Sequence, residues 1–315
     1  MRNRVRRISP GEFWDAVPAV QYHMDEPLAD AAAVALYFLN REAAKDVKVV
    51  LSGEGADELF GGYNIYRDPF TARWYDRLPP WLRAGLGAAA SLLPPARGVN
   101  FLVRRGMSLE ERYFGPTALF NEREKRRLLA NYAGDGDPMF LTEAIWDATE
   151  GLDPVTRMQQ VDLNLWLAGD ILLKADKMCM AHSLELRVPF LDRKVMEFAE
   201  HIPDRYRINE NGNKQVLRHA ANKSLPDEWA TRPKVGFPVP IVYWLREQKW
   251  YDYVKEYFTA PWASEFFNTD ELMHLLDLHF AGKGDFQRKI YTPLVFLVWY
   301  KRFFIDEGQP SVKAA

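Results

Sequence analysis

The alternation of apolar and polar residues predicts a chain that is mostly helical and has little sheet. Residues 47–51 form a short, β-branched apolar run, which is typical of a strand buried on both faces. The segment SGEGADELFGGY follows at once, and the next helix is predicted within it, at residues 57–63. A strand, a glycine loop and a helix in direct succession indicate an α/β fold.

Helical periodicity continues through most of the remaining chain. Asp30 is placed to cap a helix that runs to residue 44, and a long helical stretch at 143–181 is interrupted at 152–154. Further helices are predicted at 12–22 with a break near Pro18, and at 214–223, 269–280 and 286–304. The predicted sheet is therefore small.

The chain divides into four segments on this pattern. Residues 1–67 hold the strand and the glycine loop, and residues 68–149, rich in proline and glycine near their start, form an insertion with one or two helices. Residues 150–305 are a helical part that ends in an aromatic closing helix, and residues 306–315 are a tail. We expect the segments to form a single domain around a small parallel sheet.

Composition and charge exclude several classes of protein. Of the 315 residues, 48% are apolar and 27% are charged, which is typical of a globular chain with a substantial core. The 43 acidic and 41 basic side chains nearly balance, and this gives no electrostatic footprint for nucleic acid or for an anionic membrane. Cys179 is the only cysteine, so disulfides and cysteine-based zinc sites are excluded and a cytoplasmic location is expected.

The glycine loop matches neither of the common nucleotide-binding motifs. A dinucleotide-binding fingerprint would need glycine where Glu58 stands, and no GxxxxGK[ST] segment occurs in the chain. A structural turn capped by Asp57 is one explanation. The other is a ligand site, because ligands of open α/β sheets gather at the carboxyl ends of strands. Gly53 and Gly55 would then let the backbone approach the ligand, and Asp57 would hold Mg²⁺ against a phosphate.

Four segments, in order, carry a resemblance to a known family. VVLSGEGADELFGGY at 49–63 resembles the signature of the synthetase domain of glutamine-hydrolysing asparagine synthetases. Three other segments are similar to further parts of that family, namely DEP at 25–27, DILLKADKMCMAHSLELRVPFLD at 170–192 and RPKVGFPVPIVYWL at 232–245. The likeness extends from Ile8 to Phe304, and four ordered matches are more specific than any one of them.

The resemblance implies an α/β fold of the ATP pyrophosphatase type (adenine nucleotide alpha hydrolase-like), incomplete here, with a mostly helical C-terminal part. It implies a ligase of asparagine biosynthesis that uses ATP and Mg²⁺. In that family the β-carboxylate of aspartate is joined to AMP with release of pyrophosphate, and ammonia then displaces AMP. In complete members the ammonia comes from glutamine, which a separate N-terminal domain hydrolyses with its first cysteine as nucleophile.

The residue roles that the resemblance implies centre on the glycine loop. Ser52, Gly53, Glu54 and Gly55 are expected to lie against ATP and the adenylate. Glu54 is expected to be catalytic, near the acyl phosphate, where it assists the ammonia step. Asp57 is the expected Mg²⁺ ligand.

Lys234, within RPKVGFP, is the second expected catalytic residue. A lysine is a compact point charge on a flexible stem, which suits it to stabilise charge on the phosphates as pyrophosphate leaves. The alternative is a solvated surface lysine, which is the commoner position of this residue type. The loop shaped by Pro233 and Gly236 favours the catalytic role.

Four other residues are expected to support the site from around it, namely Glu58, Asp25, Glu26 and Arg187. Glu58 either supports the metal site or caps the helix, and the two roles have equal weight. Arg187 is expected to brace the floor of the site. Charges at helical spacing in the same region are typical of a salt-bridge network or a solvated face, namely Asp170, Lys174, Asp176 and Glu185. Cys179 lies between two methionines, which is typical of a packed small hydrophobe rather than a nucleophile.

The chain departs from the family pattern at its start. It has no SGGxDS segment, whose backbone and hydroxyls bind pyrophosphate in the family and whose aspartate shares the metal, and Met1 is followed by Arg2 where a catalytic cysteine would stand. We therefore expect a fragment that begins inside the synthetase domain, binds Mg-ATP weakly and is inactive or weakly active alone. Loss of the early strands would expose an edge of the strand at 47–51, which predicts a homodimer or a poorly ordered N-terminal region.

Two other functions remain open. One is an amide-forming or β-lactam synthetase-like enzyme with another acceptor in place of ammonia. Relatives that close a β-lactam tend to carry tyrosine where Glu54 stands, so Glu54 favours ammonia. The other is an interaction module without catalysis, which the missing pyrophosphate loop suggests. The presence of Glu54, Asp57 and Lys234 argues against it. Aspartate and glutamine-derived ammonia are thus the expected partners, with no nucleic acid and no membrane.

Overall fold

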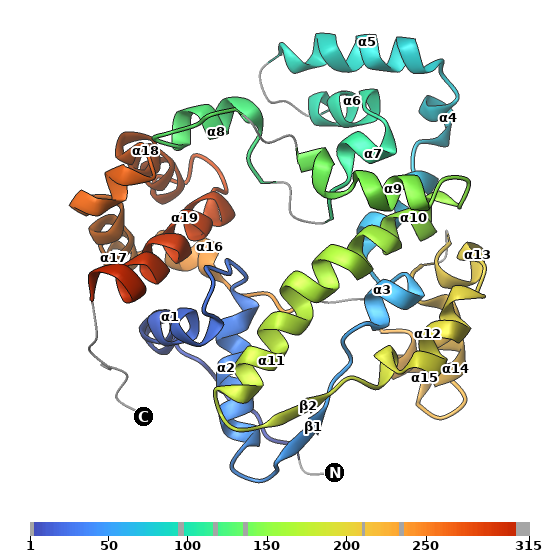
Figure 1. Ribbon diagram of the computed structural model, residues 1–315, viewed down its shortest axis with the longest axis horizontal. Helices are drawn as coiled ribbons and strands as arrows, with labels where there is room; N and C mark the ends of the chain where they lie inside the picture. The colour runs from blue at the N-terminus through green and yellow to red at the C-terminus, as the bar shows by residue number, and fades with distance from the viewer. Residues whose placement is uncertain are drawn as a thin grey trace.

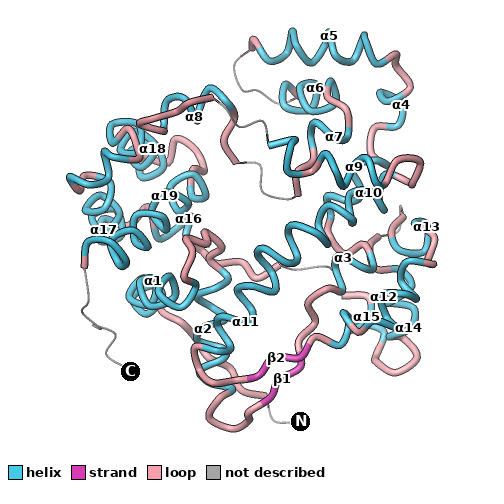
Figure 2. Tube along the Cα trace, in the orientation of Figure 1, coloured by secondary structure: helices cyan, strands magenta, loops and turns pink. Residues whose placement is uncertain are grey.

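A computed structural model describes residues 3–93, 98–115, 119–134, 138–209, 212–232 and 236–306. The one sheet within these residues has two parallel strands, β1 (Val49–Leu51) and β2 (Glu185–Arg187), with Val50 opposite Leu186. Figures 1 and 2 show this pair at the lower edge of the molecule, with helices above it on both sides. The small parallel sheet and the mostly helical remainder agree with the sequence prediction.

The strand β1 is exposed, although its sequence predicts burial on both faces. Val49 and Leu51 keep 48% and 75% of their surface accessible. The prediction was wrong because a continuous apolar run is buried only where neighbouring strands and covering helices are present, and β1 pairs with β2 alone within the described residues. The unpaired strand edge expected here is confirmed.

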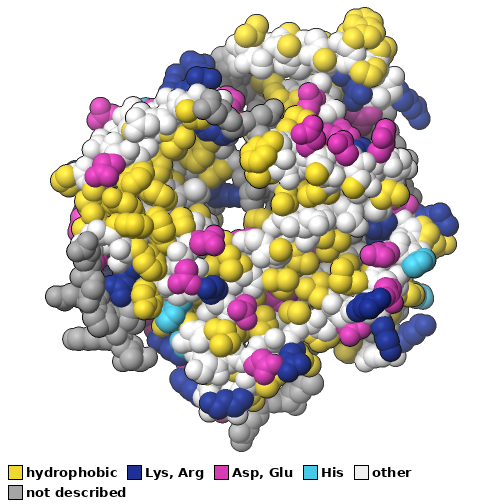
Figure 3. Space-filling model, viewed as in Figure 1, with side chains coloured by type: hydrophobic (Ala, Val, Ile, Leu, Met, Phe, Trp, Pro, Cys, Tyr) yellow, Lys and Arg dark blue, Asp and Glu magenta, His cyan; other side chains and the backbone are white. Residues whose placement is uncertain are grey.

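A long helix crosses the molecule diagonally and connects its two sides (Figure 1). It comprises α10 (Pro154–Val161), a π-helical stretch (Asp162–Leu172) and α11 (Leu173–Met180). Asp153 caps its start through its side chain. The preceding helix α9 (Glu143–Ala148) ends well before it, so the predicted interruption is confirmed. Figure 3 shows an open gap in the middle of the molecule, between the long helix and the side that holds α1 and α19.

The largest hydrophobic cluster packs α1 (Pro10–Met24) and α2 (Ala32–Ala43) against α17 (Gln248–Phe258), α18 (Thr269–Phe280) and α19 (Gln287–Tyr300). The helix α1 continues through Pro18, so the break predicted there is wrong. Proline in a helix costs about 3 kcal/mol, but fully buried neighbours such as Trp14 anchor the turns on both sides. After α19 the chain continues as a π-helical stretch, Lys301–Ile305.

The segment 68–149 holds more helices than the one or two predicted. The helices α5 (Pro80–Ser91) and α6 (Val99–Gly106) form a hairpin, in which the backbones approach closely at Gly87 and Gly106. The short helices α4 (Arg73–Asp76) and α7 (Leu109–Arg112) lie beside the hairpin, whereas α8 (Glu122–Leu128) packs against α18 (Figure 1). Capping boxes at Ser108 and Asn121 stabilise α7 and α8, which a search for apolar periodicity overlooks.

The remaining helices surround the glycine loop on the side of the molecule opposite to α1. They are α3 (Ala56–Phe60), α12 (Arg193–Glu200), α13 (Asp204–Arg207), α14 (Gln215–Ala221) and α15 (Asp227–Ala230). The exception is α16 (Ile241–Trp244), which packs against α1 in the largest hydrophobic cluster (Figure 1). Within the described residues, every helix is too short or too polar to cross a membrane.

Candidate functional site

The glycine loop leaves the carboxyl end of β1 and leads directly into α3. The amide of Ser52 donates a hydrogen bond of 2.9 Å to the carbonyl of Arg187, which ties the start of the loop to β2. Gly55 has φ of 85°, and a Cβ atom there would lie 2.2 Å from Leu191 Cδ2. Two features favour glycine at position 55, namely the left-handed backbone and the close approach of the Leu191 side chain. Gly53 is exposed, and a Cβ atom on it would meet nothing within 4 Å.

Glu54 holds a buried carboxylate oxygen in this loop. Its Oε2 atom is inaccessible to solvent and has no hydrogen-bond partner among the described residues. A buried carboxylate oxygen without a partner is costly, and native proteins rarely leave one in place without a functional reason. The charge of Glu54 also reaches Cys179, whose pKa is raised to about 11 by burial first and by Asp176 and Glu54 next. The thiol stays protonated, in agreement with its interpretation as a packed hydrophobe.

Asp57 forms an ion pair at the start of α3 that the sequence did not reveal. Lys214 Nζ lies 3.0 Å from Asp57 Oδ1, and both side chains are mostly buried. A Cβ atom on Gly62 would lie 1.9 Å from the same carboxylate oxygen and 2.3 Å from Lys214 Cε. The second glycine of the FGGY segment therefore leaves room for this pair. Lys214 is the N-cap of α14 and has φ of 53°. It lies two residues after Gly212, and this nearby glycine is the only feature of the sequence that hints at an unusual backbone there.

Glu58 lies in the interior beside α3. The hydroxyl of Tyr63 donates to its Oε1 at 2.5 Å, and Gln159 donates to its backbone carbonyl. Burial raises the pKa of Glu58, and the Tyr63 hydrogen bond opposes that rise. A cavity of about 420 Å³ adjoins this residue and is also lined by Leu59 and Arg207. The N-cap of α3 is Gly55, and no side chain caps this helix. Glu58 is therefore a side chain buried against Tyr63 rather than a helix cap.

Asp162 forms a second buried carboxylate near Glu58. The hydroxyls of Tyr66 and Tyr113 donate to its Oδ2 atom at 2.5 and 2.6 Å. Burial raises the pKa of Asp162 to about 6, the two hydrogen bonds oppose the rise, and the charge of Glu58 adds to it. No sequence pattern predicts this cluster, because its three members come from segments far apart in the chain.

Comparison with known proteins places this loop and its surroundings in a family. The family model described as Asparagine synthase matches residues 1–301. The chain belongs to the asparagine synthase family. It is 41% identical over 313 residues to asparagine synthetase [glutamine-hydrolyzing] 1 of Bacillus subtilis, covering 98% of this chain and 49% of that protein. It is 42% identical over 312 residues to a putative asparagine synthetase [glutamine-hydrolyzing] of Mycobacterium bovis, covering 99% and 48%.

The chain spans about half the length of the curated relatives it matches. A more distant match is the asparagine synthetase [glutamine-hydrolyzing] of Homo sapiens, 31% identical over 139 residues, which covers 38% of this chain and 24% of the human protein. The resemblance read from the four sequence segments is confirmed at the level of the family.

The other residues expected to support an asparagine synthase site occupy more peripheral positions. Asp25 ends α1 with φ of 62°, its exposed side chain pairs with Lys177, and Glu26 beside it is also exposed. The guanidinium of Arg187 pairs with Glu185 at 2.6 Å in solvent, so only the backbone carbonyl of Arg187 reaches the loop. Lys234 lies outside the described residues.

Of the charged positions with helical spacing, Asp170 and Lys174 form the salt bridge that was one of the two predicted outcomes. Asp176 is exposed, and Glu185 lies on β2 and pairs with Arg187 in solvent.

Lys174 is buried, and its Nζ atom lies 2.6 Å from Asp170 Oδ2 and also contacts Asp30. Asp30 accepts a further hydrogen bond of 2.9 Å from the amide of Ala32. The N-cap of α2 is Ala31, so the cap predicted at Asp30 lies one residue too early. The contacts of Lys174 connect the long helix to α2 and have a structural role.

Proposed function

We propose that this chain is the synthetase part of an ATP-dependent amide ligase that forms asparagine from aspartate and ammonia. The family of the chain supports this proposal, and the observation that carries it is the buried Glu54 oxygen without a hydrogen-bond partner among the described residues. Glu54 sits in a glycine loop at the carboxyl end of a strand, where open α/β folds bind their ligands. An unsatisfied acceptor at that place suits a substrate that brings a donor, and ammonia is such a donor.

The proposed reaction has two steps. An oxygen of the aspartate β-carboxylate attacks the α-phosphorus of ATP, and the bond to pyrophosphate breaks. The nitrogen of ammonia then attacks the acyl carbon, AMP leaves with the carboxylate oxygen that it received, and the nitrogen loses a proton. Glu54 accepts this proton as general base, and the half-buried Ser52 and the exposed Gly53 contact the adenylate.

Mg²⁺ belongs to the proposal as the counterion of the phosphates. Magnesium is commonly held by one or two carboxylates together with substrate phosphates, and Asp57 is the carboxylate that the loop supplies. No group of three metal-binding side chains occurs among the described residues, so the phosphates themselves would complete the coordination. When bound, the metal would neutralise charge on the leaving pyrophosphate. Lys214, 3.0 Å from Asp57, would add a second positive charge at the same place.

The remaining parts of the proposal concern what reaches the site. Ammonia would come from the hydrolysis of glutamine. The names of the matched relatives imply a glutaminase part that would carry out this hydrolysis. A cytoplasmic location and a homodimer, formed through the open edge of β1, are part of the same proposal. The second candidate function is the same adenylation with an acceptor other than ammonia. Glu54 stands where relatives that close a β-lactam tend to carry tyrosine, and this favours ammonia.

The test measures aspartate-dependent release of AMP and pyrophosphate with Mg-ATP and an ammonium salt, with mass spectrometry of the product. We expect asparagine, and we expect Glu54→Gln to abolish it while circular dichroism shows an unchanged fold. Glu197→Gln is the matched control, because Glu197 is exposed and pairs only with Arg193 on α12. The upstream segment of a relative is added in parallel reactions. Release of AMP and pyrophosphate without asparagine would indicate another acceptor. If no reaction released AMP or pyrophosphate, the ligase proposal would be refuted.

A further inference from the structure

The outward face of α5 is mostly apolar. Its exposed residues are uncharged, and Ser91 is the one polar side chain among them. They are Pro80, Trp81, Ala84, Gly85, Leu86, Ala88, Ala89 and Ser91, and the exposed Leu92 follows directly. Trp81 and Leu92, at its two ends, are 74% and 86% exposed. The helix carries one charged residue, Arg83, which lies on the inner side, 3.5 Å from Asp76. A surface helix normally turns its polar residues outward, so this face is unpartnered.

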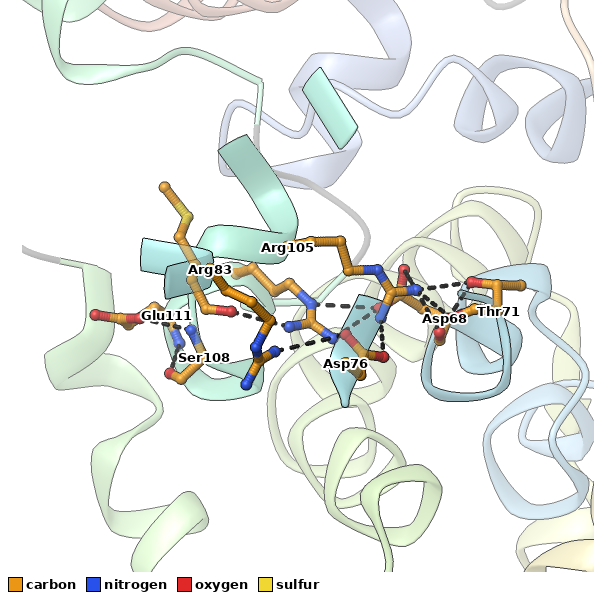
Figure 4. Close-up of polar contacts among 9 residues, drawn as sticks. Asp68, Thr71, Asp76, Arg83, Arg105, Ser108 and Glu111 are labelled. Carbon is orange, nitrogen blue, oxygen red and sulfur yellow. Dashed lines mark hydrogen bonds and ion pairs between the residues drawn. The ribbon is translucent and has the colours of Figure 1, made fainter. Parts of the chain in front are cut away.

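The hairpin of α5 and α6 holds this face rigidly. Arg105 at the end of α6 donates to the carbonyls of Asp68 and Thr71 at 2.6 and 2.9 Å and to the carboxylate of Asp76 at 2.9 Å (Figure 4). Its side chain is almost fully buried by these contacts. The hairpin is therefore anchored at its base, and Figure 1 shows α5 as the outermost element at the top of the molecule.

The charge of the hairpin differs in sign from that of the whole chain. Residues 68–107, which include the base of the hairpin, contain six arginines and two acidic residues, Asp68 and Asp76, so the rest of the chain is net negative. Two of these arginines, Arg83 and Arg105, pair with Asp76, whereas Arg77 and Arg104 are exposed. The overall charge balance, which predicts no attraction to anionic surfaces, conceals this local excess of positive charge.

We propose that the outward face of α5 binds the surface of a lipid bilayer that contains anionic headgroups. Helices that bind in this way lie in the plane of the interface with tryptophan and leucine in the acyl boundary and arginine at the headgroups. The positive charge of the hairpin is complementary to such a surface. A second copy of the chain fits less well, because a face about 18 Å long and 10 Å wide is far smaller than the roughly 800 Å² that each partner buries in a stable dimer.

The experiment is co-sedimentation of the 315-residue chain with phosphatidylcholine vesicles, with and without phosphatidylglycerol. We expect binding to the anionic vesicles only, and we expect high salt to weaken it. Trp81→Glu should lower the bound fraction roughly tenfold. Trp229→Glu is the matched control and should leave binding unchanged, because Trp229 is 68% exposed on the distant helix α15. Both sites are exposed, so both variants should fold, as circular dichroism would verify.

Three results would overturn the proposal. They are no binding to either vesicle, equal binding to neutral and anionic vesicles, and equal loss of binding in the two tryptophan variants. Sedimentation velocity on the same samples identifies the other occupant. A dimer that Trp81→Glu dissociates, without vesicle binding, would assign the face to a second copy of the chain.

Discussion

Lys214 Nζ lies 3.0 Å from Asp57 Oδ1, and Gly62 provides the space in which the two side chains meet. The pair brings the start of α14 to the start of α3, although the residues are far apart in the sequence. Both side chains are more than four-fifths buried, which makes the interaction stronger than a surface ion pair and makes loss of either partner costly. Variants of Gly62, Lys214 and Asp162 test the site and its surroundings, and variants of Arg105 test the base of the hairpin.

Gly62→Ala should disrupt this ion pair. The added Cβ atom would lie 1.9 Å from the Asp57 carboxylate, so the side chains must separate. We expect the free energy of unfolding to fall by roughly 1–3 kcal/mol, measured by denaturant unfolding. Gly53→Ala is the control, because its Cβ atom meets nothing within 4 Å. Equal stability of the two variants would contradict the interpretation of Gly62.

Lys214→Met should weaken the binding of Mg-ATP and slow adenylation, and it should also lower the stability of the fold because the buried Asp57 carboxylate loses this ion pair. The lysine is proposed to stabilise the phosphates together with the metal at Asp57, and loss of one such group slows reactions by roughly a hundredfold. Pyrophosphate release measured in the presence of the upstream segment checks this prediction. Lys214→Arg keeps the charge and should retain part of the activity. A Met variant with unchanged turnover would restrict Lys214 to a structural role.

Asp162→Asn should remove a pH dependence of stability. The pKa of Asp162 is about 6 in the folded protein and lies near 4 when unfolded, so between these values the folded state keeps a proton that the unfolded state has lost. The contribution of Asp162 to stability is therefore fully present below pH 4 and is lost as the pH rises through 6, by up to about 3 kcal/mol.

Unfolding curves between pH 4 and 7 test this prediction. The free energy of unfolding of the parent chain, relative to that of the Asn variant, should decrease as the pH rises from 4 to 7. Tyr113→Phe removes one hydrogen bond that lowers the pKa of Asp162, so it should extend the decline to higher pH. Parallel pH profiles for all three proteins would contradict the assignment.

Arg105→Met should destabilise the base of the hairpin. Its guanidinium is buried and contacts Asp68, Thr71 and Asp76, so the substitution leaves these acceptors without their donor. The two aspartates keep some access to water, and we expect a loss of roughly 2–3 kcal/mol, at the low end for a broken buried pair. Arg104→Met, at the adjacent exposed position, should change stability by less than about 0.5 kcal/mol. Thermal unfolding of the two variants compares them directly, and equal melting temperatures would refute the anchoring role.

The sequence by itself determined the local elements and the family. The glycine loop, the helix at 269–280 and the break before Pro154 follow from short-range rules of capping, proline geometry and periodicity, which act between near neighbours. The ordered motifs identified the family because they are continuous segments. These features could be predicted since no distant residue is needed to produce them.

The tertiary structure decided the burial of β1, the continuity of α1 through Pro18 and the contacts of the site. Leu51 is exposed because burial of a strand depends on neighbours that the strand itself does not specify. Lys214 reaches Asp57, and Tyr66 and Tyr113 reach Asp162, only after packing has brought their segments together. The energies of such ion pairs and buried carboxylates depend on distance and desolvation, and both are properties of the folded chain.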